Sequence, residues 1–294
     1  MSQTRVKVWI MASRPKTLWA ATAPVLIGSA MAYAYGGFHL LSALAALFGG
    51  VMIQIGTNFA NDYFDYSKGS DRLDRIGPVR VTQAGLVTAS SMKRATVLVF
   101  LLALLAGFYL VYRGGWPIVV IGLLSILSGI LYTGGPRPLG YTGLADIFVL
   151  VFFGPVAVGG TYFVQTLQIN WEVLVAGLSP GLLSVAILTV NNLRDIDSDR
   201  VSGKRTLPVR FGPTFARMEY LLAIVIACLI PIGLVVYGVG SAWQLLTLYV
   251  LPLSLPSIRA VFSSRDGEIL NNVLAGTGRL LLVYSLLFSL GCLL

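Results

Sequence analysis

Two acidic clusters stand at the ends of apolar runs that are long enough to cross a bilayer. Their side chains are carboxylates and carboxamides: Asn58, Asn61, Asp62 and Asp65 in the first cluster, and Asn191, Asn192, Asp195, Asp197 and Asp199 in the second. An aspartate at the centre of a membrane helix costs roughly 2.5–3.5 kcal/mol on insertion scales. Repeated aspartates at helix ends therefore need contact with water or with a cation. A polyvalent cation site is the first hypothesis.

The spacing within each cluster favours one polar stripe. On a helix, residues four apart lie on the same face, so Asn191, Asp195 and Asp199 line up. Carboxylates this close repel one another unless a cation lies between them. Mg²⁺ suits such oxygen ligands and prefers one or two carboxylates plus the phosphate oxygens of a substrate. The expected metal ligands are Asp62, Asp65, Asp195, Asp199, Asn58 and Asn191, and the four aspartates are also the expected catalytic residues.

Basic residues are interleaved with these acids. Arginine grips a phosphate through two parallel hydrogen bonds and lysine binds it as a point charge, so the mixture fits a bound diphosphate. The residues expected to bind the diphosphate are Asn58, Asn61, Lys68, Arg72, Asn191, Arg194, Lys204 and Arg205.

Each cluster also has an ordinary explanation. A basic loop can simply orient a membrane protein, and an acidic helix end can be a solvated cap. Both explanations predict scattered charges, whereas Asn58-x3-Asp62 recurs as Asn191-x3-Asp195 at the end of a second apolar run. A cation transporter is the rival from another functional class. It would place ionisable residues in the middle of the membrane along a path, but the acids here lie near span ends.

The composition indicates a polytopic membrane protein of one domain covering residues 1–294. Mean hydropathy is +0.81 and only 11% of the residues are charged, whereas soluble domains have about 25%. A span needs about 20 apolar residues. Nine such runs are expected, giving an all-α fold around a central cavity: 17–36, 40–61, 95–113, 116–133, 144–166, 173–194, 218–238, 243–262 and 272–294.

The net charge of +9 reports orientation rather than nucleic-acid binding. With nine spans, nearly all basic residues fall in connections on one side, and only Arg113 lies near the other face. The positive-inside rule then places the N-terminus and the acidic clusters in the cytoplasm and the C-terminus outside.

Four stretches resemble the UbiA-type intramembrane aromatic prenyltransferases: residues 14–20, 61–72, 77–85 and 191–207. The resemblance covers essentially the whole chain and is strongest to the branch of the family that prenylates 1,4-dihydroxy-2-naphthoate in menaquinone or phylloquinone synthesis. One departure is Gly69, at a position where the family often has an aspartate.

The resemblance implies a Mg²⁺-dependent enzyme, with two ions bridging the diphosphate of a polyprenyl donor. Departure of the diphosphate leaves an allylic cation, which the electron-rich naphthoate ring attacks, and the ring carboxylate is lost as CO₂. Aromatic faces stabilise such a cation, and Tyr63, Phe64 and Tyr132 are candidates. Residues expected at the acceptor are Arg137, Tyr132, Tyr141 and Asp146. Other acceptors, namely 4-hydroxybenzoate, homogentisate or a tetrapyrrole, stay open, as does the length of the prenyl chain.

Overall fold

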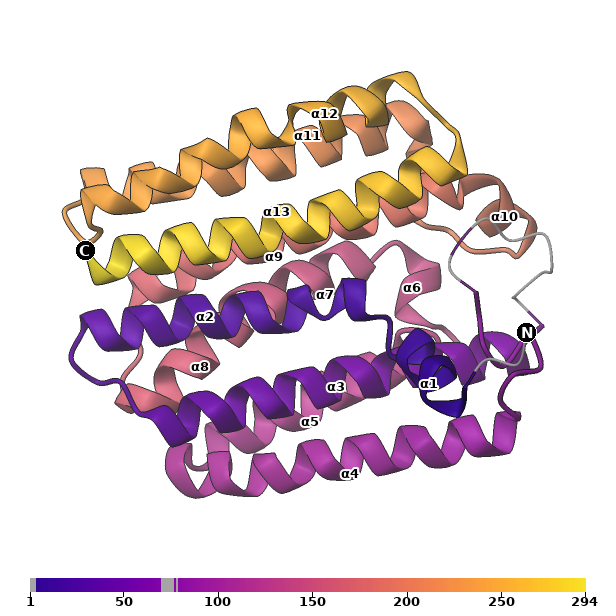
Figure 1. The fold of residues 1–294 in the computed structure, drawn as a ribbon, viewed down its shortest axis with the longest axis horizontal. Helices are drawn as coiled ribbons and strands as arrows, with labels where there is room; N and C mark the ends of the chain where they lie inside the picture. The colour runs from indigo at the N-terminus through magenta and orange to yellow at the C-terminus, as the bar shows by residue number, and fades with distance from the viewer. Residues whose placement is uncertain (1–3, 70–76, 78) are drawn as a thin grey trace.

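The computed structural model describes residues 4–69, 77 and 79–294. Within these residues every regular element is a helix and no strand occurs. The long helices run nearly parallel along one axis of the molecule (Figure 1). The expected all-α fold is confirmed.

The N-terminal half supplies the helices in the lower part of Figure 1. Their bounds are α1 (Arg5–Ser13), η1 (Pro15–Thr17), α2 (Trp19–Ala34), α3 (Leu40–Ser67), α4 (Ala89–Gly114), α5 (Trp116–Leu131), α6 (Leu139–Thr142), α7 (Ala145–Val151), η2 (Phe152–Val156) and α8 (Ala157–Thr166). The C-terminal half contributes α9 (Trp171–Arg194), α10 (Ile196–Val201), α11 (Leu207–Val236), η3 (Ala242–Tyr249), α12 (Val250–Ser263) and α13 (Gly267–Leu293).

The length and composition of these helices fit an integral membrane protein. Seven helical stretches are long and apolar enough to cross a bilayer in the described part of the chain, or eight if the bent pair α1–η1 and α2 counts as one span. The expected span at 116–133 corresponds to α5, whose 16 residues fall short of the about 20 that a span needs. The count of nine is therefore not confirmed.

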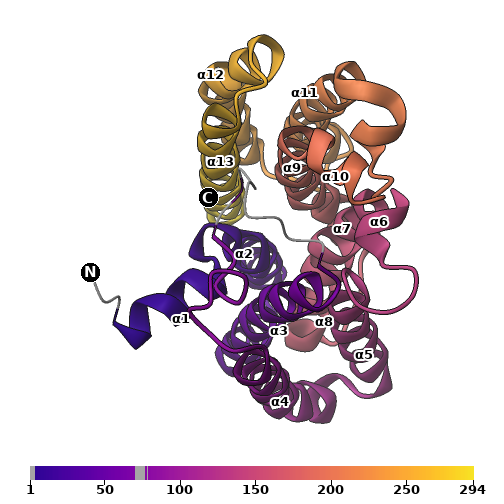
Figure 2. The same cartoon turned by 90° about the vertical axis from the view of Figure 1, so that its right-hand side faces the viewer.

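The first expected span, 17–36, begins with a sharp elbow. The stretch Arg5–Thr17 meets α2 at 53°, because Arg14 adopts a left-handed backbone conformation with φ 51° and ψ 69°. A left-handed conformation is costly for a residue with a Cβ atom, and Pro15 then starts the next turn. The elbow turns α1 away from the bundle, as Figure 2 shows.

Small residues let the two halves approach closely. A Cβ atom added at Gly177 of α9 would lie 2.8 Å from the Cα of Pro155, and one at Gly181 would lie 2.5 Å from the carbonyl oxygen of Leu150. Close backbone contact of this kind is how membrane helices pack without a hydrophobic driving force. It fixes α9 against α7 and η2, and so fixes the second acidic cluster relative to the first half.

Both acidic clusters lie at one end of the bundle. The C-terminal ends of α3 and α9 meet at the end where α1, α6 and α10 lie, whereas α13 finishes at the opposite end (Figure 1). Residues 130 positions apart in the sequence are thereby brought together.

Candidate active site

One cavity of about 430 Å³ opens between the two acidic clusters and extends into the bundle. Its mouth is lined by charged and amide side chains: Arg14, Asn58, Asn61, Asp65, Arg80, Asn191, Asn192, Asp195, Asp199 and Lys204. Its deeper wall is mostly apolar, with residues such as Ile53, Leu104, Ile121 and Val156. The arrangement suits a molecule with an anionic head and a hydrocarbon tail.

Asp195 is held by a buried arginine. The Arg194 guanidinium donates from Nε to Asp195 Oδ1 (2.7 Å) and from an Nη to Asp195 Oδ2 (2.6 Å). It also donates to the carboxamide oxygens of Asn191 (2.8 Å) and Asn271 (2.6 Å). The Arg194 side chain is 0% exposed and does not line the cavity. Arg194, expected to bind diphosphate, therefore positions Asp195 and Asn191 from behind.

Asp199 lies one turn further along the chain, on α10. Its carboxylate pairs with the Lys204 ammonium group at 3.6 Å, and both residues line the cavity. Asp197, on the same short helix, is exposed to solvent and is not part of the lining. Arg205, expected beside Lys204, is also exposed outside the cavity.

Asp65 carries the charge of the first cluster into the cavity. Its Oδ2 accepts a 2.6 Å hydrogen bond from Arg80, and the two side chains are 1% and 8% exposed. The Tyr141 hydroxyl lies 3.5 Å from Asp65 Oδ1. The first motif thus contributes the Asp65 carboxylate to the cavity, and this carboxylate pairs with a basic residue from the loop that follows α3.

Asp62, expected to bind metal, has a different environment. Its two carboxylate oxygens each accept a 3.1 Å hydrogen bond, from the backbone amides of Val81 and Thr82. The side chain is buried and does not line the cavity. Asp62 therefore fastens the loop that carries Arg80.

The first cluster's carboxamides brace neighbouring elements at the mouth. The Asn58 amide nitrogen donates to the Ser13 carbonyl oxygen (2.9 Å) and to Thr17 Oγ1 (3.2 Å), which secures the elbow around Arg14. The Asn61 carboxamide oxygen accepts from Thr133 Oγ1 at 2.8 Å. Both asparagines remain part of the cavity lining.

Two lysines flank the ring of Tyr141. The ammonium groups of Lys68 and Lys204 lie 5.5 and 4.9 Å from the ring centroid, a cation–π geometry. Lys68 also donates to the carbonyl oxygens of Thr133 (2.6 Å) and Gly135 (3.0 Å). Burial lowers the pKa of Lys68, and Lys204 lowers it further, while Asp65 opposes the change. Lys68 lies outside the lining and helps to hold Tyr141.

The residues expected at the aromatic acceptor divide into two groups. Tyr132 and Tyr141 line the cavity. Arg137 is exposed and Asp146 is buried, and neither lines the cavity.

The remaining expected residues lie elsewhere. Tyr63 and Phe64 pack against each other outside the cavity. Arg72 lies outside the described residues.

Comparison with known proteins agrees with this architecture. Residues 21–288 match the UbiA prenyltransferase family. The chain belongs to the UbiA prenyltransferase family. It is 40% identical over 295 residues to 1,4-dihydroxy-2-naphthoate octaprenyltransferase of Escherichia coli strain K12, with 98% of this chain and 96% of the relative covered.

Solved structures of UbiA homologues share the fold. The apo structure of a homologue from Aeropyrum pernix K1 matches with a TM-score of 0.70 at 16% identity, covering 95% of this chain and 98% of the other. A homologue from Archaeoglobus fulgidus bound to GPP and Mg²⁺ matches with a TM-score of 0.65 at 15% identity, covering 96% of this chain and 99% of the other.

The cavity mouth of this UbiA chain offers oxygen donors that fit a hard divalent cation. Asp65, Asp195 and Asp199 supply carboxylates, and asparagines beside them supply carboxamides. No three acidic, histidine or cysteine side chains come close enough to form a metal cage among the described residues. This donor set fits Mg²⁺ that completes its coordination with substrate phosphate and water.

Two cavity bases were not among the site residues expected from the sequence. Arg14 reaches the mouth from the elbow and Arg80 from the loop after α3. Both belong to stretches that carry the UbiA resemblance, so each was visible as a base within a family motif. A charge pattern alone does not reveal them, because a base beside a span also satisfies the positive-inside rule.

The role of Asp62 can be tested by amide hydrogen exchange. In Asp62→Leu, we expect the amides of Val81 and Thr82 to exchange about tenfold faster or more, because each loses a hydrogen bond to a charged acceptor, worth about 1.5–3 kcal/mol. Asp65→Asn, which leaves the Asp62 carboxylate in place, is the matched control and should keep both amides protected. Unchanged exchange in Asp62→Leu would contradict this assignment.

Proposed function

We propose that this protein transfers a polyprenyl group from a prenyl diphosphate to 1,4-dihydroxy-2-naphthoate, with Mg²⁺ as cofactor and release of diphosphate and CO₂. The main support is the convergence of Asp65, Asp195 and Asp199 with three bases at the polar mouth of one otherwise apolar cavity. The 40% identical relative is a 1,4-dihydroxy-2-naphthoate octaprenyltransferase, which favours the naphthoate acceptor over 4-hydroxybenzoate, homogentisate or a tetrapyrrole.

The donor diphosphate fits the cavity mouth. Arg14, Arg80 and Lys204 supply positive charge there, and Asp65, Asp195 and Asp199 would hold Mg²⁺ against the phosphate oxygens. When bound, the metal neutralises charge that develops on the departing diphosphate. The guanidinium groups donate hydrogen bonds to the same oxygens, which stabilises the transition state. The prenyl tail then lies along the apolar wall.

The acceptor ring must lie where the allylic carbon is released. The bond from that carbon to the diphosphate oxygen breaks, and the ring carbon that bears the carboxylate supplies the electron pair of the new carbon–carbon bond. The ring carboxylate leaves as CO₂, and its bonding electrons restore aromaticity. Tyr132, Phe148 and Phe152 line the same cavity, and aromatic faces stabilise a passing cation.

The charge distribution supports a cytoplasmic active site. Bases flank the end of the bundle that holds the acidic clusters, and the positive-inside rule places that end in the cytoplasm. The N-terminus then lies in the cytoplasm and the C-terminus outside.

The proposed reaction is tested with a panel of acceptors and one labelled prenyl diphosphate. We expect diphosphate and CO₂ release, with a prenylated naphthoquinol product, only when dihydroxynaphthoate and Mg²⁺ are both present. If product forms from 4-hydroxybenzoate, homogentisate or a tetrapyrrole instead, that compound replaces dihydroxynaphthoate as the proposed acceptor. Turnover that survives excess EDTA would remove the metal from the proposal.

The second acidic cluster provides a matched set of variants on one short stretch. Asp195→Asn and Asp199→Asn should each lower kcat/KM by roughly 100-fold or more, since each removes charge that stabilises the transition state. Asp197→Asn is the control, because Asp197 is exposed on the same helix and lies outside the cavity. Membrane insertion is checked for all three. Equal activity of the Asp195 and Asp197 variants would contradict the role of Asp195.

Orientation is tested with single cysteines introduced after Cys228 and Cys292 are replaced by serine. Gln168→Cys lies between α8 and α9, and Arg265→Cys lies at the opposite end, between α12 and α13. We expect a membrane-impermeant maleimide to label Gln168→Cys in intact cells and Arg265→Cys only after lysis. The reverse pattern would place the active site outside.

A further inference from the structure

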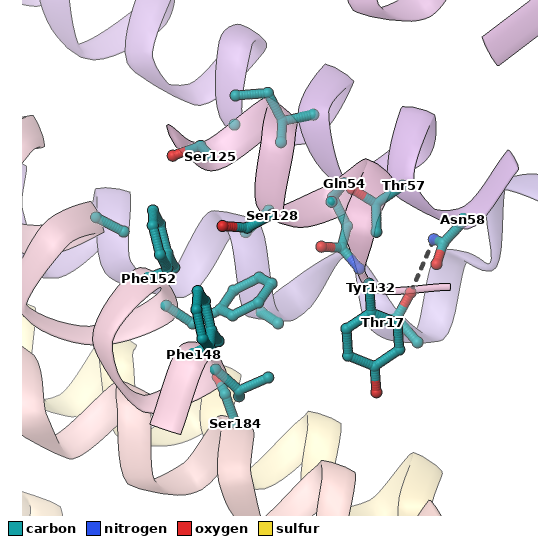
Figure 3. Close-up of a pocket in the computed structure, with 18 of the residues that line it drawn as sticks. Thr17, Gln54, Thr57, Asn58, Ser125, Ser128, Tyr132, Phe148, Phe152 and Ser184 are labelled. Carbon is teal, nitrogen blue, oxygen red and sulfur yellow. Dashed lines mark hydrogen bonds between the residues drawn. The ribbon is translucent and has the colours of Figure 1, made fainter. Parts of the chain in front are cut away.

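Polar side chains continue into the cavity below its charged mouth. Gln54 on α3, Ser128 on α5 and Ser184 on α9 line the wall among apolar residues. Figure 3 shows the Gln54 carboxamide and the Ser128 hydroxyl in the same part of the cavity as the rings of Tyr132, Phe148 and Phe152. The rings of Phe148 and Phe152 are parallel within 5°, with centroids 6.1 Å apart. This chamber therefore has both aromatic walls and hydrogen-bonding groups.

Gln54 belongs to the same face of α3 as the metal-binding cluster. Residues 54, 58, 61 and 65 follow helical spacing, and all four line the cavity. Gln54 precedes Asp65 by eleven residues, about 16 Å along the helix axis. Ser184 precedes Asp195 by the same number of residues on α9. The two residues therefore lie at matching depths below the two acids.

The Gln54 carboxamide is polar, yet it makes no hydrogen bond to another residue in the part of the chain that the structure describes. It lies well inside a helix with the composition of a membrane span. The side chain is half-buried and lines a cavity whose wall is mostly apolar, so a hydrogen-bonding group of a bound ligand would stabilise its carboxamide there. The position therefore calls for a ligand with hydrogen-bonding groups at that depth.

Only one of the two proposed substrates meets this requirement. Beyond its diphosphate, the prenyl donor is a hydrocarbon and neither donates nor accepts a hydrogen bond. The naphthoate carries two ring hydroxyls, and an aromatic ring fits beside Phe148 and Phe152. The hydroxyl at position 1 is adjacent to the carboxylate and can form an intramolecular hydrogen bond with it. The hydroxyl at position 4 has no such partner.

We propose that Gln54 is a specificity-determining residue that hydrogen-bonds the 4-hydroxyl of the naphthoate acceptor, with Ser128 on the facing helix completing the polar side of the chamber. This inference rests on the proposed function. It replaces the exposed Arg137 and the buried Asp146 as acceptor-recognising residues, since neither reaches the cavity. Gln54 orients the ring while the acids and bases at the mouth act on the diphosphate.

The test measures the KM for each substrate in Gln54→Leu and in Gln54→Met, which keeps the unbranched shape. We expect the KM for dihydroxynaphthoate to rise about tenfold in both variants, equivalent to about 1.4 kcal/mol, while the KM for prenyl diphosphate stays within twofold. Gln168→Leu is the matched control, because Gln168 is exposed on the loop before α9, and it should behave like wild type.

A ligand that lacks the 4-hydroxyl isolates the proposed bond. The inhibition constant of 1-hydroxy-2-naphthoate, used as a competitor, should be the same in wild type and in Gln54→Leu. Three results would overturn the assignment of Gln54. They are an unchanged KM for dihydroxynaphthoate, a rise in the KM for prenyl diphosphate alone, or a rise in the inhibition constant of the competitor equal to the rise in the KM for dihydroxynaphthoate. Failure of wild type to prenylate dihydroxynaphthoate would instead overturn the proposed function on which it depends.

Discussion

Neutralisation of buried charge is the constraint on which the site depends. Each carboxylate at the cavity mouth is paired with a base: Asp65 with Arg80, Asp195 with Arg194 and Asp199 with Lys204. An ionised carboxylate next to a membrane interior is too costly to leave alone. The three pairs nevertheless differ. Arg194 is fully buried and donates hydrogen bonds to residues of both α9 and α13, whereas Arg80 and Lys204 come from connecting segments and line the cavity themselves.

The two halves of the chain supply equivalent walls. Asn61-x3-Asp65 on α3 faces Asn191-x3-Asp195 at the end of α9, 130 residues later, and Gln54 and Ser184 extend the same correspondence into the cavity. The glycines of α9 pack closely against α7 and η2, which fixes the second wall to the N-terminal half of the chain. Polar, aromatic and apolar layers then succeed one another with depth. Under the proposed function, such layering would separate the head of a lipid diphosphate from its tail, with the acceptor ring between them.

Much of this arrangement could be predicted from the sequence, for identifiable physical reasons. Long apolar runs predict spans, and acids at their ends predict a site, so the all-α fold and the convergence of Asp65 with Asp195 followed. The sequence did not show which Asn-x3-Asp pair of the first cluster lines the cavity, since Asn58-x3-Asp62 and Asn61-x3-Asp65 have the same spacing. Only the position of the following loop distinguishes the two pairs, because its backbone amides donate hydrogen bonds to the Asp62 carboxylate. Gln54 was missed because one amide in an apolar run looks like ordinary variation.

The pairing of Asp62 with the loop explains why adjacent acids in one motif need not share a task. Asp62 fixes the amides of Val81 and Thr82, which directly follow Arg80, and Arg80 reaches Asp65. A carboxylate that accepts two backbone hydrogen bonds is already satisfied and gains little from a metal ion. Asp65 lines the cavity and pairs with Arg80 through one oxygen, so under the proposed function its carboxylate would hold the cation and the guanidinium beside it would bind the diphosphate. Under the proposed function, Asp62 therefore positions Arg80 for the diphosphate, whereas Asp65 would hold the metal ion.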